Sequence, residues 1–409
     1  MTKWERASVK SIRGSLTTFF CLLFVFNMAA NFVHPVTPSI IVELGLNDYM
    51  FGLALAAQMA LNFLFSPLWG KLAGQLGSRR VILINALGYA LGQVFFALAR
   101  TEAELLLARM FAGIFCGGVY VAFMTYTVNC SEEAHLGRNL TLNATVQAVS
   151  ASFGYFVGGM VGEIDIYLSV WLQVATLAGI GTLMFLTARE DRPAARSTLT
   201  GREWLRACNP FSAFLQCRRF MTRALALVFL GYGLGNLGYI AFEQCFNFCL
   251  RDQFGLTSGY NGVIKAALGA ISLLANSTLC LWILRRRSAM PWLAGVMCVC
   301  TAAMAGVLLS DGLIPFVITN VIFFAFYFVS VPLMQNRAAV LGAGPDSNLV
   351  MGAFNAVKSF GSIFGSALAG FMYEAHVKLP FGFGLIAFAL AALTALLACK
   401  APAKEEKHA

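Results

Sequence analysis

The sequence predicts an all-α, polytopic membrane protein with twelve transmembrane helices. Two observations support this fold class. Of the 409 residues, 59% are hydrophobic and only 12% are charged, so the apolar surface exceeds what the core of a water-soluble protein could bury. Apolar stretches of ~20 residues, the length at which a helix spans a bilayer, also follow one another between Ser15 and Cys399. They are too long and too continuously apolar for barrel strands, and a helix satisfies its own backbone hydrogen bonds in lipid.

The first expected span follows a basic segment that is similar to the start of a signal peptide. The apolar stretch after it contains Asn31, His34 and Pro35 and lacks a small-residue cleavage site, so we interpret it as a retained helix. The other spans follow from apolar segments of membrane-crossing length. In order, the twelve expected spans are residues 15–41, 49–73, 80–99, 104–129, 139–163, 166–188, 222–249, 258–284, 290–310, 313–341, 347–374 and 379–399.

A polar, arginine-rich stretch separates the sixth span from the seventh. Part of it is either a short amphipathic helix on the inner leaflet or a disordered loop, and the sequence leaves both open. A Phe-Gly-x-x-x-Gly pattern in span five (Gly154, Gly158) returns in span eleven (Gly361, Gly365), which indicates a weak internal duplication. The expected domains are a cytoplasmic N-terminal segment (1–14), a six-helix bundle (15–188), a cytoplasmic linker (189–221), a second six-helix bundle (222–399) and a cytoplasmic tail (400–409).

The distribution of Lys and Arg predicts the orientation. If both termini face the cytoplasm, nearly all basic loop residues lie on that side, and the other side holds only Arg100, Arg251 and Lys378. This asymmetry is what the positive-inside rule requires. It accounts for most of the net charge of +10 without a nucleic-acid partner. We therefore expect a multi-pass protein of the plasma membrane with both termini cytoplasmic.

The loop between spans two and three carries Gly70, Gly77, Arg79 and Arg80. This pattern resembles the loop signature Gly-x-Leu-Ala-Asp-Arg-x-Gly-Arg-Arg of the major facilitator superfamily, and the resemblance covers the whole chain once the topology is included. It implies the major facilitator fold, with these residues in a conformational loop motif. Gly74 stands where the family has an acid and Gln75 where it has a base, which puts the charge pair of the family's latch in question.

Spans four and five resemble the superfamily's drug:proton antiporter branch. Arg109-Met-Phe-Ala-Gly113 is similar to that branch's Arg-x-x-x-Gly pattern, whose buried arginine is implicated in proton transfer. The span-five glycines are similar to its motif Gly-x-x-x-Gly-Pro-x-x-Gly-Gly, except that Gly159 replaces the proline and Glu163 the last glycine. Close helix packing by small residues explains the same glycines equally well. The helix-five motif comprises Gly154, Gly158, Gly159 and Gly162.

Ionisable residues inside a bilayer cost at least ~2.5 to 3.5 kcal/mol each, so they usually face a cavity or a partner. For proton coupling the candidates are Glu243, Arg109 and His34. A partly desolvated carboxylate at Glu243 would suit a proton carrier, although a static salt bridge between Glu243 and Lys265 remains an alternative. His34 is alternatively a hydrogen-bonded helix histidine.

Polar stripes at helical spacing on spans one and seven predict a central aqueous pathway, and the resemblance implies that spans one, four, seven and ten surround it. Three intramembrane cations against one carboxylate favour a zwitterionic or anionic organic solute over a lipophilic cation. The expected substrate-cavity residues are Asn27, Asn31, Tyr232, Asn236, Tyr239, Asn247, Lys265, Tyr327, Asn355 and Lys358.

These features predict a secondary active transporter that moves a small organic solute by alternating access, with proton-coupled efflux of a drug or metabolite as the favoured function. Proton-coupled or facilitated uptake of a nutrient is the alternative, and a non-transporting receptor or scaffold fits less well. The chain lacks the Gly-x-x-x-x-Gly-Lys-Ser/Thr phosphate loop, and its four histidines are dispersed, so we expect neither an ATPase nor an enzyme. The expected partners are the lipid bilayer, the solute and protons, with no cofactor, no metal and a monomeric protein.

Overall fold

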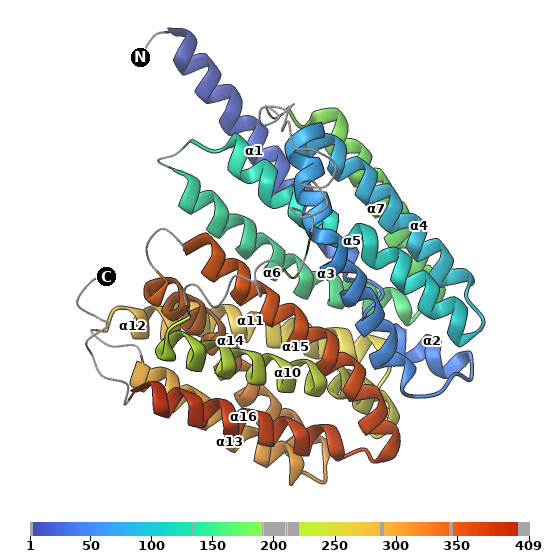
Figure 1. Cartoon of the computed structure of the whole chain (residues 1–409). Coiled ribbons are helices and arrows are strands. Elements are labelled where there is room, and N and C mark those ends of the chain that lie inside the picture. The colour runs from blue at the N-terminus through green and yellow to red at the C-terminus, as the bar shows by residue number, and fades with distance from the viewer. Residues whose placement is uncertain are drawn as a thin grey trace. The chain divides into compact units, whose positions relative to one another are not determined.

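The computed structural model describes residues 3–132, 135–189, 191, 209, 211, 221–286, 290–342 and 347–399 (Figure 1). Every regular element in these ranges is a helix, which confirms the all-α prediction. The predicted linker lies outside the described residues except at a few positions, and the predicted tail lies outside them entirely. The helices are α1 (Lys3–Ala30), α2 (Thr37–Glu43), α3 (Met50–Leu76), α4 (Ser78–Leu98), α5 (Glu102–Cys130), α6 (Leu136–Gly162), α7 (Ile166–Thr187), α10 (Arg223–Asp252), α11 (Ser258–Ala275), the π-helix η3 (Asn276–Cys280), α12 (Leu281–Leu284), α13 (Met290–Leu308), α14 (Leu313–Leu341), α15 (Ser347–Ala375) and α16 (Leu379–Cys399).

Nine helices in the described ranges are long and apolar enough to cross a membrane: α3, α4, α5, α7, α10, α13, α14, α16 and the continuous stretch Ser258–Leu284. Each coincides with a predicted span. The other three predicted spans coincide with α1 plus α2, with α6 and with α15. Only Leu16–Ala30 of α1 is apolar, and polar residues along α6 and α15 keep these two helices below the apolarity of the nine.

The first predicted span, residues 15–41, is two helices rather than one. Helix α1 ends at Ala30 and α2 begins at Thr37. Pro35 lacks a backbone N–H, and its ring would clash with the carbonyl four residues earlier in a continuous helix. Tighter turns replace the helix here, because Val36 N–H donates to the carbonyl of Val33 (3.2 Å). The span is therefore discontinuous next to His34.

The described chain divides into two compact units. The first comprises residues 1–46, 57–210 and 257–266. In it α4 packs against α5 and α7, while α1 packs against α6 and α7 (Figure 1). A Cβ on Gly92 of α4 would lie 2.8 Å from Ala112 of α5, so the closeness of this pair depends on the glycine. The aromatic core of the unit is fully buried around Phe26, Phe123 and Tyr126.

The second unit comprises residues 47–56, 211–256 and 267–409. Helix α10 packs against α14, α15 and α16, and α13 packs against α14 and α16. Its core is a cluster of phenylalanine rings in edge-to-face and tilted contacts, for example Phe242 with Phe323 at 4.8 Å between ring centroids. These contacts fix α10, the helix with the longest predicted polar stripe, against α14.

Helices α3 and α11 divide between the units. The first turns of α3, up to Ala56, belong to the second unit, where Phe51 stacks on Phe248 at 4.7 Å. A Cβ on Gly52 would lie 2.2 Å from the carbonyl oxygen of Ser366 on α15. The first turns of α11, residues 257–266, belong to the first unit.

Candidate functional site

Arg109 lies on α5 with only 5% of its surface exposed. Its guanidinium donates hydrogen bonds to Oε1 of Gln58 on α3 (3.2 Å) and to Oγ1 of Thr37 at the start of α2 (3.2 Å). The ring of Phe96 on α4 has its centroid 3.9 Å from the guanidinium carbon, a cation–π contact. No carboxylate in the described ranges pairs with Arg109. This intramembrane cation is therefore held by neutral oxygens and an aromatic face.

The glycine four residues after Arg109, Gly113, lies where α5 is in close contact with α3. A Cβ on Gly113 would lie 2.3 Å from the backbone oxygen of Gln58, so α3 and α5 can approach here only without a side chain. One turn further on, a Cβ on Gly117 would lie 2.2 Å from Oδ1 of Asn62. The spacing thus sets the distance between α3 and α5, and with it the hydrogen bond from Arg109 to Gln58.

His34 and Lys265 meet at one aromatic ring within the first unit. His34, at the break between α1 and α2, stacks on Tyr155 of α6 with 5.5 Å between ring centroids and an interplanar angle of 11°. The Nζ of Lys265 lies 5.6 Å from the centroid of the same ring, and its side chain is buried. A predicted proton-coupling residue and a predicted cavity residue are therefore linked through Tyr155.

The helix-five glycines make close backbone contacts with two other elements of the first unit. A Cβ at Gly154 or Gly158 would lie 2.2 Å from a carbonyl oxygen of α1 or of the turn after it. At Gly162 it would lie 2.3 Å from a side-chain methyl of that turn, and at Gly159 it would lie 2.5 Å from the carbonyl of Ser258 in α11. Helix packing alone can account for these glycines, and their role in antiport stays a prediction.

Glu163 follows α6 at the position where the resembled motif has its last glycine. Its carboxylate accepts a hydrogen bond from the backbone N–H of Gly259 in the first turn of α11. Free N–H groups and the helix dipole make a helix N-terminus favourable for a carboxylate. Nearby, the hydroxyls of Ser39 and Ser258 lie 3.1 Å apart. The departure from the motif thus joins α6 to the start of α11.

Asn27 belongs to a closed polar network between α1, α5 and α6. Its amide donates to the carbonyl of Gln147 (2.6 Å) and to the hydroxyl of Ser150 (2.8 Å). Its Oδ1 accepts from the hydroxyl of Tyr120 (2.7 Å). Asn31 donates to the backbone oxygen of Asn27 (2.7 Å) and remains partly exposed. Asn27 therefore joins three helices, whereas Asn31 retains access to solvent.

The loop motif ends at a buried helix cap. Gly77 has a φ of +83°, a conformation that favours glycine, and α4 begins at the next residue. Both carboxylate oxygens of Asp191 accept from the N–H of Ser78 (2.9 and 3.0 Å), and one accepts from the side chain of Asn129 (2.9 Å). Asp191 is 3% exposed. It places a negative charge at the N-terminus of α4.

The two arginines of the loop motif differ in their surroundings. The guanidinium carbon of Arg79 lies 4.4 Å from the ring centroid of Phe185 on α7, while Arg80 is exposed. Gly70 packs loosely, since a Cβ there would meet only Val121, at 3.5 Å. Within the motif, the turn at Gly77 is the position where the structure requires a glycine.

On α10 the two predicted tyrosines of the cavity are buried in stacked pairs. Tyr232 stacks on Phe354 of α15 and Tyr239 on Tyr327 of α14, each at 4.0 Å between centroids and 11° between planes. Asn236 lies between the two tyrosines on α10. Its amide donates to two groups of α15, the carbonyl of Lys358 and the hydroxyl of Ser362 (3.3 Å). This stripe of α10 therefore packs on its neighbours over much of its length.

Glu243 and Asn247 follow on the same helix. Glu243 is half-buried. Asn247 is 6% exposed, and its Oδ1 has no hydrogen-bond partner in the described residues. Glu243 belongs to the second unit and Lys265 to the first, so the proposed pair between them stays a prediction.

Asn355 and Lys358 on α15 are exposed. The backbone carbonyl of Lys358 accepts a hydrogen bond from the amide of Asn236 (2.8 Å). Its ammonium makes no ion pair or hydrogen bond with any described residue. The two predicted cavity residues on this helix are thus accessible, in contrast to those on α10.

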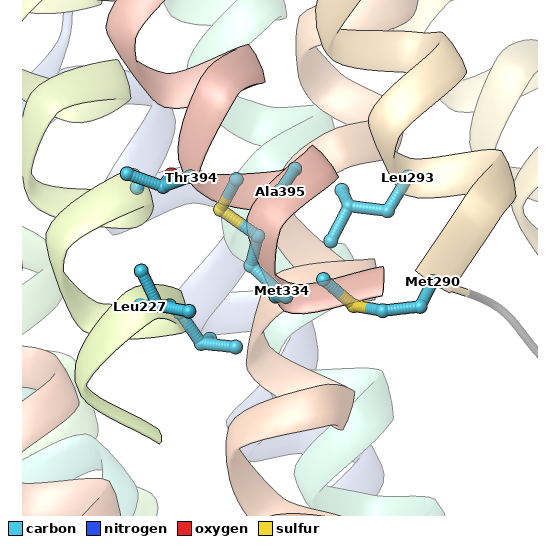
Figure 2. A pocket seen from close by; sticks show the side chains of 9 residues that line it. Leu227, Met290, Leu293, Met334, Thr394 and Ala395 are labelled. Carbon is cyan, nitrogen blue, oxygen red and sulfur yellow. The ribbon is translucent and has the colours of Figure 1, made fainter. Parts of the chain in front are cut away.

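A small pocket lies in the second unit among α10, α13, α14 and α16 (Figure 2). It contains none of the predicted site residues. Its single polar side chain, Thr394, donates to the carbonyl of Ala391 (2.8 Å). Leu227, Met290, Leu293 and Met334 give it an apolar lining. We assign no solute site to it.

Sequence reasoning missed the partners of several predicted residues. Gln58, Thr37 and Tyr155 were not singled out, although Gln58 is a polar residue in an otherwise apolar span. Asp191 was missed because it lies beyond span six, far along the chain from the loop motif that it caps. A search for isolated polar residues in apolar spans could have identified Gln58.

Comparison with known proteins gives consistent matches over the whole chain. Residues 19–342 match the family model of the Major Facilitator Superfamily. "Multidrug resistance protein 1" of Bacillus subtilis is 23% identical, covering 95% of this chain and 97% of that protein. "Quinolone resistance protein NorA" of Staphylococcus aureus (strain Mu50) is 20% identical, covering 88% and 89%.

Solved structures share the fold at low identity. A bacterial homologue of the human lysosomal transporter Spinster, in an inward-facing and occupied conformation, matches with a TM-score of 0.78 and 12% identity over 99% of both chains. The human organic anion transporter MFSD10 matches with a TM-score of 0.68 and 19% identity over 94% of this chain and 99% of that chain.

Proposed function

Because the chain belongs to the Major Facilitator Superfamily, we propose that it exports a small organic solute in exchange for protons. The family makes it a multi-pass membrane transporter of small solutes and not an enzyme. Two of its relatives are named for resistance to drugs or quinolones, and this supports export over uptake. We place it in the plasma membrane as a monomer, and the distribution of its basic loop residues supports an orientation with both termini cytoplasmic.

The observation that carries the proposal is the environment of Arg109. A guanidinium held by Gln58 and Thr37 connects α5 to the break in the first span, where backbone groups are not committed to a continuous helix. Broken helices are a feature of coupling sites in secondary transporters. A change of protonation nearby would alter the contacts at this break, and this links proton movement to helix movement.

Glu243 is the carboxylate that we propose to carry the proton. It lies half-buried on α10, the helix that carries the longest predicted polar stripe. His34, stacked on Tyr155, is the second candidate on the proton path. A static pair of Glu243 with Lys265 is the competing role, and it predicts loss of stability, not loss of coupling, on substitution.

In this proposal two six-helix bundles, residues 15–188 and 222–399, rock about the linker and expose the solute alternately to each side. The solute contacts come from the predicted cavity residues that remain accessible, among them Asn31, Asn355 and Lys358. The glycine turn at Gly77 of the loop motif and the close approach that the helix-five glycines allow support the movement.

The test compares the wild type, Glu243→Gln and the matched control Glu374→Gln in efflux-deficient bacteria. Glu374 is an exposed carboxylate at the end of α15, so its variant loses the same charge away from the proposed proton site. Accumulation of labelled drugs, sugars, amino acids and organic anions is measured with and without a protonophore. We expect the wild type and Glu374→Gln to lower the level of at least one compound, and Glu243→Gln or the protonophore to abolish this.

Uptake is the second candidate function, because the motif departures at Gly74, Gly159 and Glu163 weaken the assignment of an export direction. If the wild type raises the level of a nutrient inside the cells, the proposal of export is wrong and uptake takes its place. Export that survives in Glu243→Gln would remove Glu243 from the proton path while leaving transport itself in place.

A further inference from the structure

We infer that Lys358 is the recognition site for the carboxylate of an organic anion, which names the substrate class of the proposed transporter. The inference rests on the proposed function, because it assumes that a solute reaches the middle of the membrane. It is carried by the depth, the orientation and the free ammonium of this one side chain.

Lys358 lies near the middle of its helix. It is three residues from Gly361, the midpoint of α15, which is ~5 Å along the axis at a helical rise of ~1.5 Å per residue. With α15 centred in a hydrocarbon core ~30 Å thick, the nearer headgroup region is ~10 Å away. A lysine side chain cannot reach the membrane surface from that depth.

Lys358 also does not lie on the lipid-facing side of α15. The large exposed apolar side chains of this helix are Phe364, Leu368 and Phe371. At ~100° per residue, corresponding to ~3.6 residues per turn, Leu368 is ~80°, Phe364 ~120° and Phe371 ~140° from Lys358, all on the same side of Lys358 around the helix. Asn355, Ser362 and Ser366 are polar residues that lie within about a quarter turn of Lys358 on the opposite side. An exposed cation on this polar face therefore faces water and not lipid.

The position of the Lys358 backbone is fixed. The amide of Asn236 donates to its carbonyl (2.8 Å) and to the hydroxyl of Ser362 (3.3 Å). A Cβ on Gly361 would lie 2.7 Å from Nδ2 of Asn236, so α10 and α15 are in close contact here. The cation is thus presented from a rigid helix pair, which lowers the ordering cost of binding a ligand.

The ammonium of Lys358 is available for a ligand. It pairs with no carboxylate in the part of the chain that the structure describes. Asn355, three residues earlier and also exposed, is its neighbour on the helix surface, and its amide can donate a second hydrogen bond. A carboxylate has two acceptor oxygens, which suits an ammonium beside an amide. A lipophilic cation would be repelled at the same place.

The binding experiment uses the full-length protein in lipid nanodiscs without any ion gradient. Two xanthene dyes serve as probes, 6-carboxyfluorescein as the anion and rhodamine 123 as the cation, and fluorescence anisotropy gives their affinities. The variants are Lys358→Gln, the charge-retaining Lys358→Arg, and the control Lys378→Gln. The Lys378 ammonium lies outside the spans and pairs with Asp311 (3.0 Å), so this control removes the same charge elsewhere.

We expect the wild type, Lys358→Arg and Lys378→Gln to bind carboxyfluorescein more tightly than rhodamine 123. Lys358→Gln should lose affinity for carboxyfluorescein by about tenfold or more, as for a hydrogen bond to a charged group, and keep its affinity for rhodamine 123. Asn355→Ala should lose a few-fold. Thermal unfolding of each variant confirms that it is folded.

The inference is overturned if the wild type binds the anion no better than the cation, if it does not bind carboxyfluorescein, or if Lys358→Gln and Lys378→Gln weaken binding equally. These outcomes are independent of the transport test. Anion binding at Lys358 without gradient-driven export would contradict the proposed function alone, whereas export of rhodamine 123 with no anion preference would contradict this inference alone.

Discussion

Arg109 and Lys358 are both cations within predicted spans, one in each unit, and their surroundings are opposite. Arg109 is 5% exposed and bound by two neutral oxygens and a phenyl ring. Lys358 is exposed, and its ammonium has no partner among the described residues. A buried charge is tolerated only when it is hydrogen-bonded, and the planar fork of arginine can serve several acceptors at once. The first unit satisfies its cation internally, whereas no described residue of the second unit pairs with the ammonium of Lys358.

The sharpest test of this contrast replaces each cation by methionine. Arg109→Met should lower the free energy of unfolding by ~2 to 4 kcal/mol, because it leaves Gln58 and Thr37 without a donor and removes the cation–π contact. Lys358→Met should change it by less than ~0.5 kcal/mol, as for an exposed side chain. Thermal unfolding in detergent measures both. Equal losses would mean that Lys358 is also a structural residue and would break the comparison.

The dependence of the first unit on close packing is tested by Gly158→Ala. The added Cβ would lie 2.2 Å from the carbonyl oxygen of Phe32, so the helices must separate, at a cost of ~1 to 3 kcal/mol.

The matched control for Gly158 is Gly179→Ala in α7, where a Cβ meets nothing within 4 Å. It should be neutral or stabilising by up to ~1 kcal/mol through helix propensity. Unfolding temperatures of the two variants decide the matter. If they shift alike, the close approach of α6 to α1 does not hold the first unit together.

Two helix caps of the first unit allow the stability contribution of a buried carboxylate to be compared with that of an exposed one. Asp191 caps α4 at 3% exposure, and Asp165 caps α7 by accepting from Leu168 (2.9 Å) on the surface. Asp191→Asn should lower stability by ~1 kcal/mol and Asp165→Asn by only a few tenths, because water screens the exposed charge. Unfolding at low and at high salt provides the measurement. A larger salt dependence for Asp191 than for Asp165 would contradict the assignment.

The smallest expected effect concerns the second unit, at the loop before α3. Burial, followed by the carboxylates of Asp252 and Glu374, raises the pKa of Asp48. An acid with a raised pKa in the folded state favours folding below its ordinary pKa and loses this contribution as the pH rises through the folded value.

Asp48→Asn should therefore have a slightly higher free energy of unfolding than the wild type at pH 7. The increase should be only a few tenths of a kcal/mol, because the group is largely solvated. The difference should disappear toward pH 4. Thermal unfolding from pH 4 to 7 tests this prediction. It is wrong if the wild type is more stable than Asp48→Asn at pH 7.

The sequence predicted the helical spans well and the contacts between them poorly, and the reason is physical. A bilayer imposes length and apolarity on each span separately, so hydropathy locates helices such as α5 and α10. The hydrogen bond from Arg109 to Gln58 joins residues on different helices and depends on how their faces meet, which no single span encodes. Asp191 is a further case, because it lies beyond the end of α7 and its partner Ser78 begins α4, far away along the chain. The break at Pro35 was visible as a residue, but its effect on the span was underestimated.

The two helices that share the Phe-Gly-x-x-x-Gly pattern, α6 and α15, are both among the long helices that are not apolar enough to qualify as spans by themselves. Their glycines, serines and amides permit close packing, and the same residues weaken the signal that inserts a helix into the membrane during synthesis. Each is followed at once by a strongly apolar helix, α7 or α16. We therefore expect α6 and α15 each to insert as a hairpin with the next helix, in the same order in both halves of the chain.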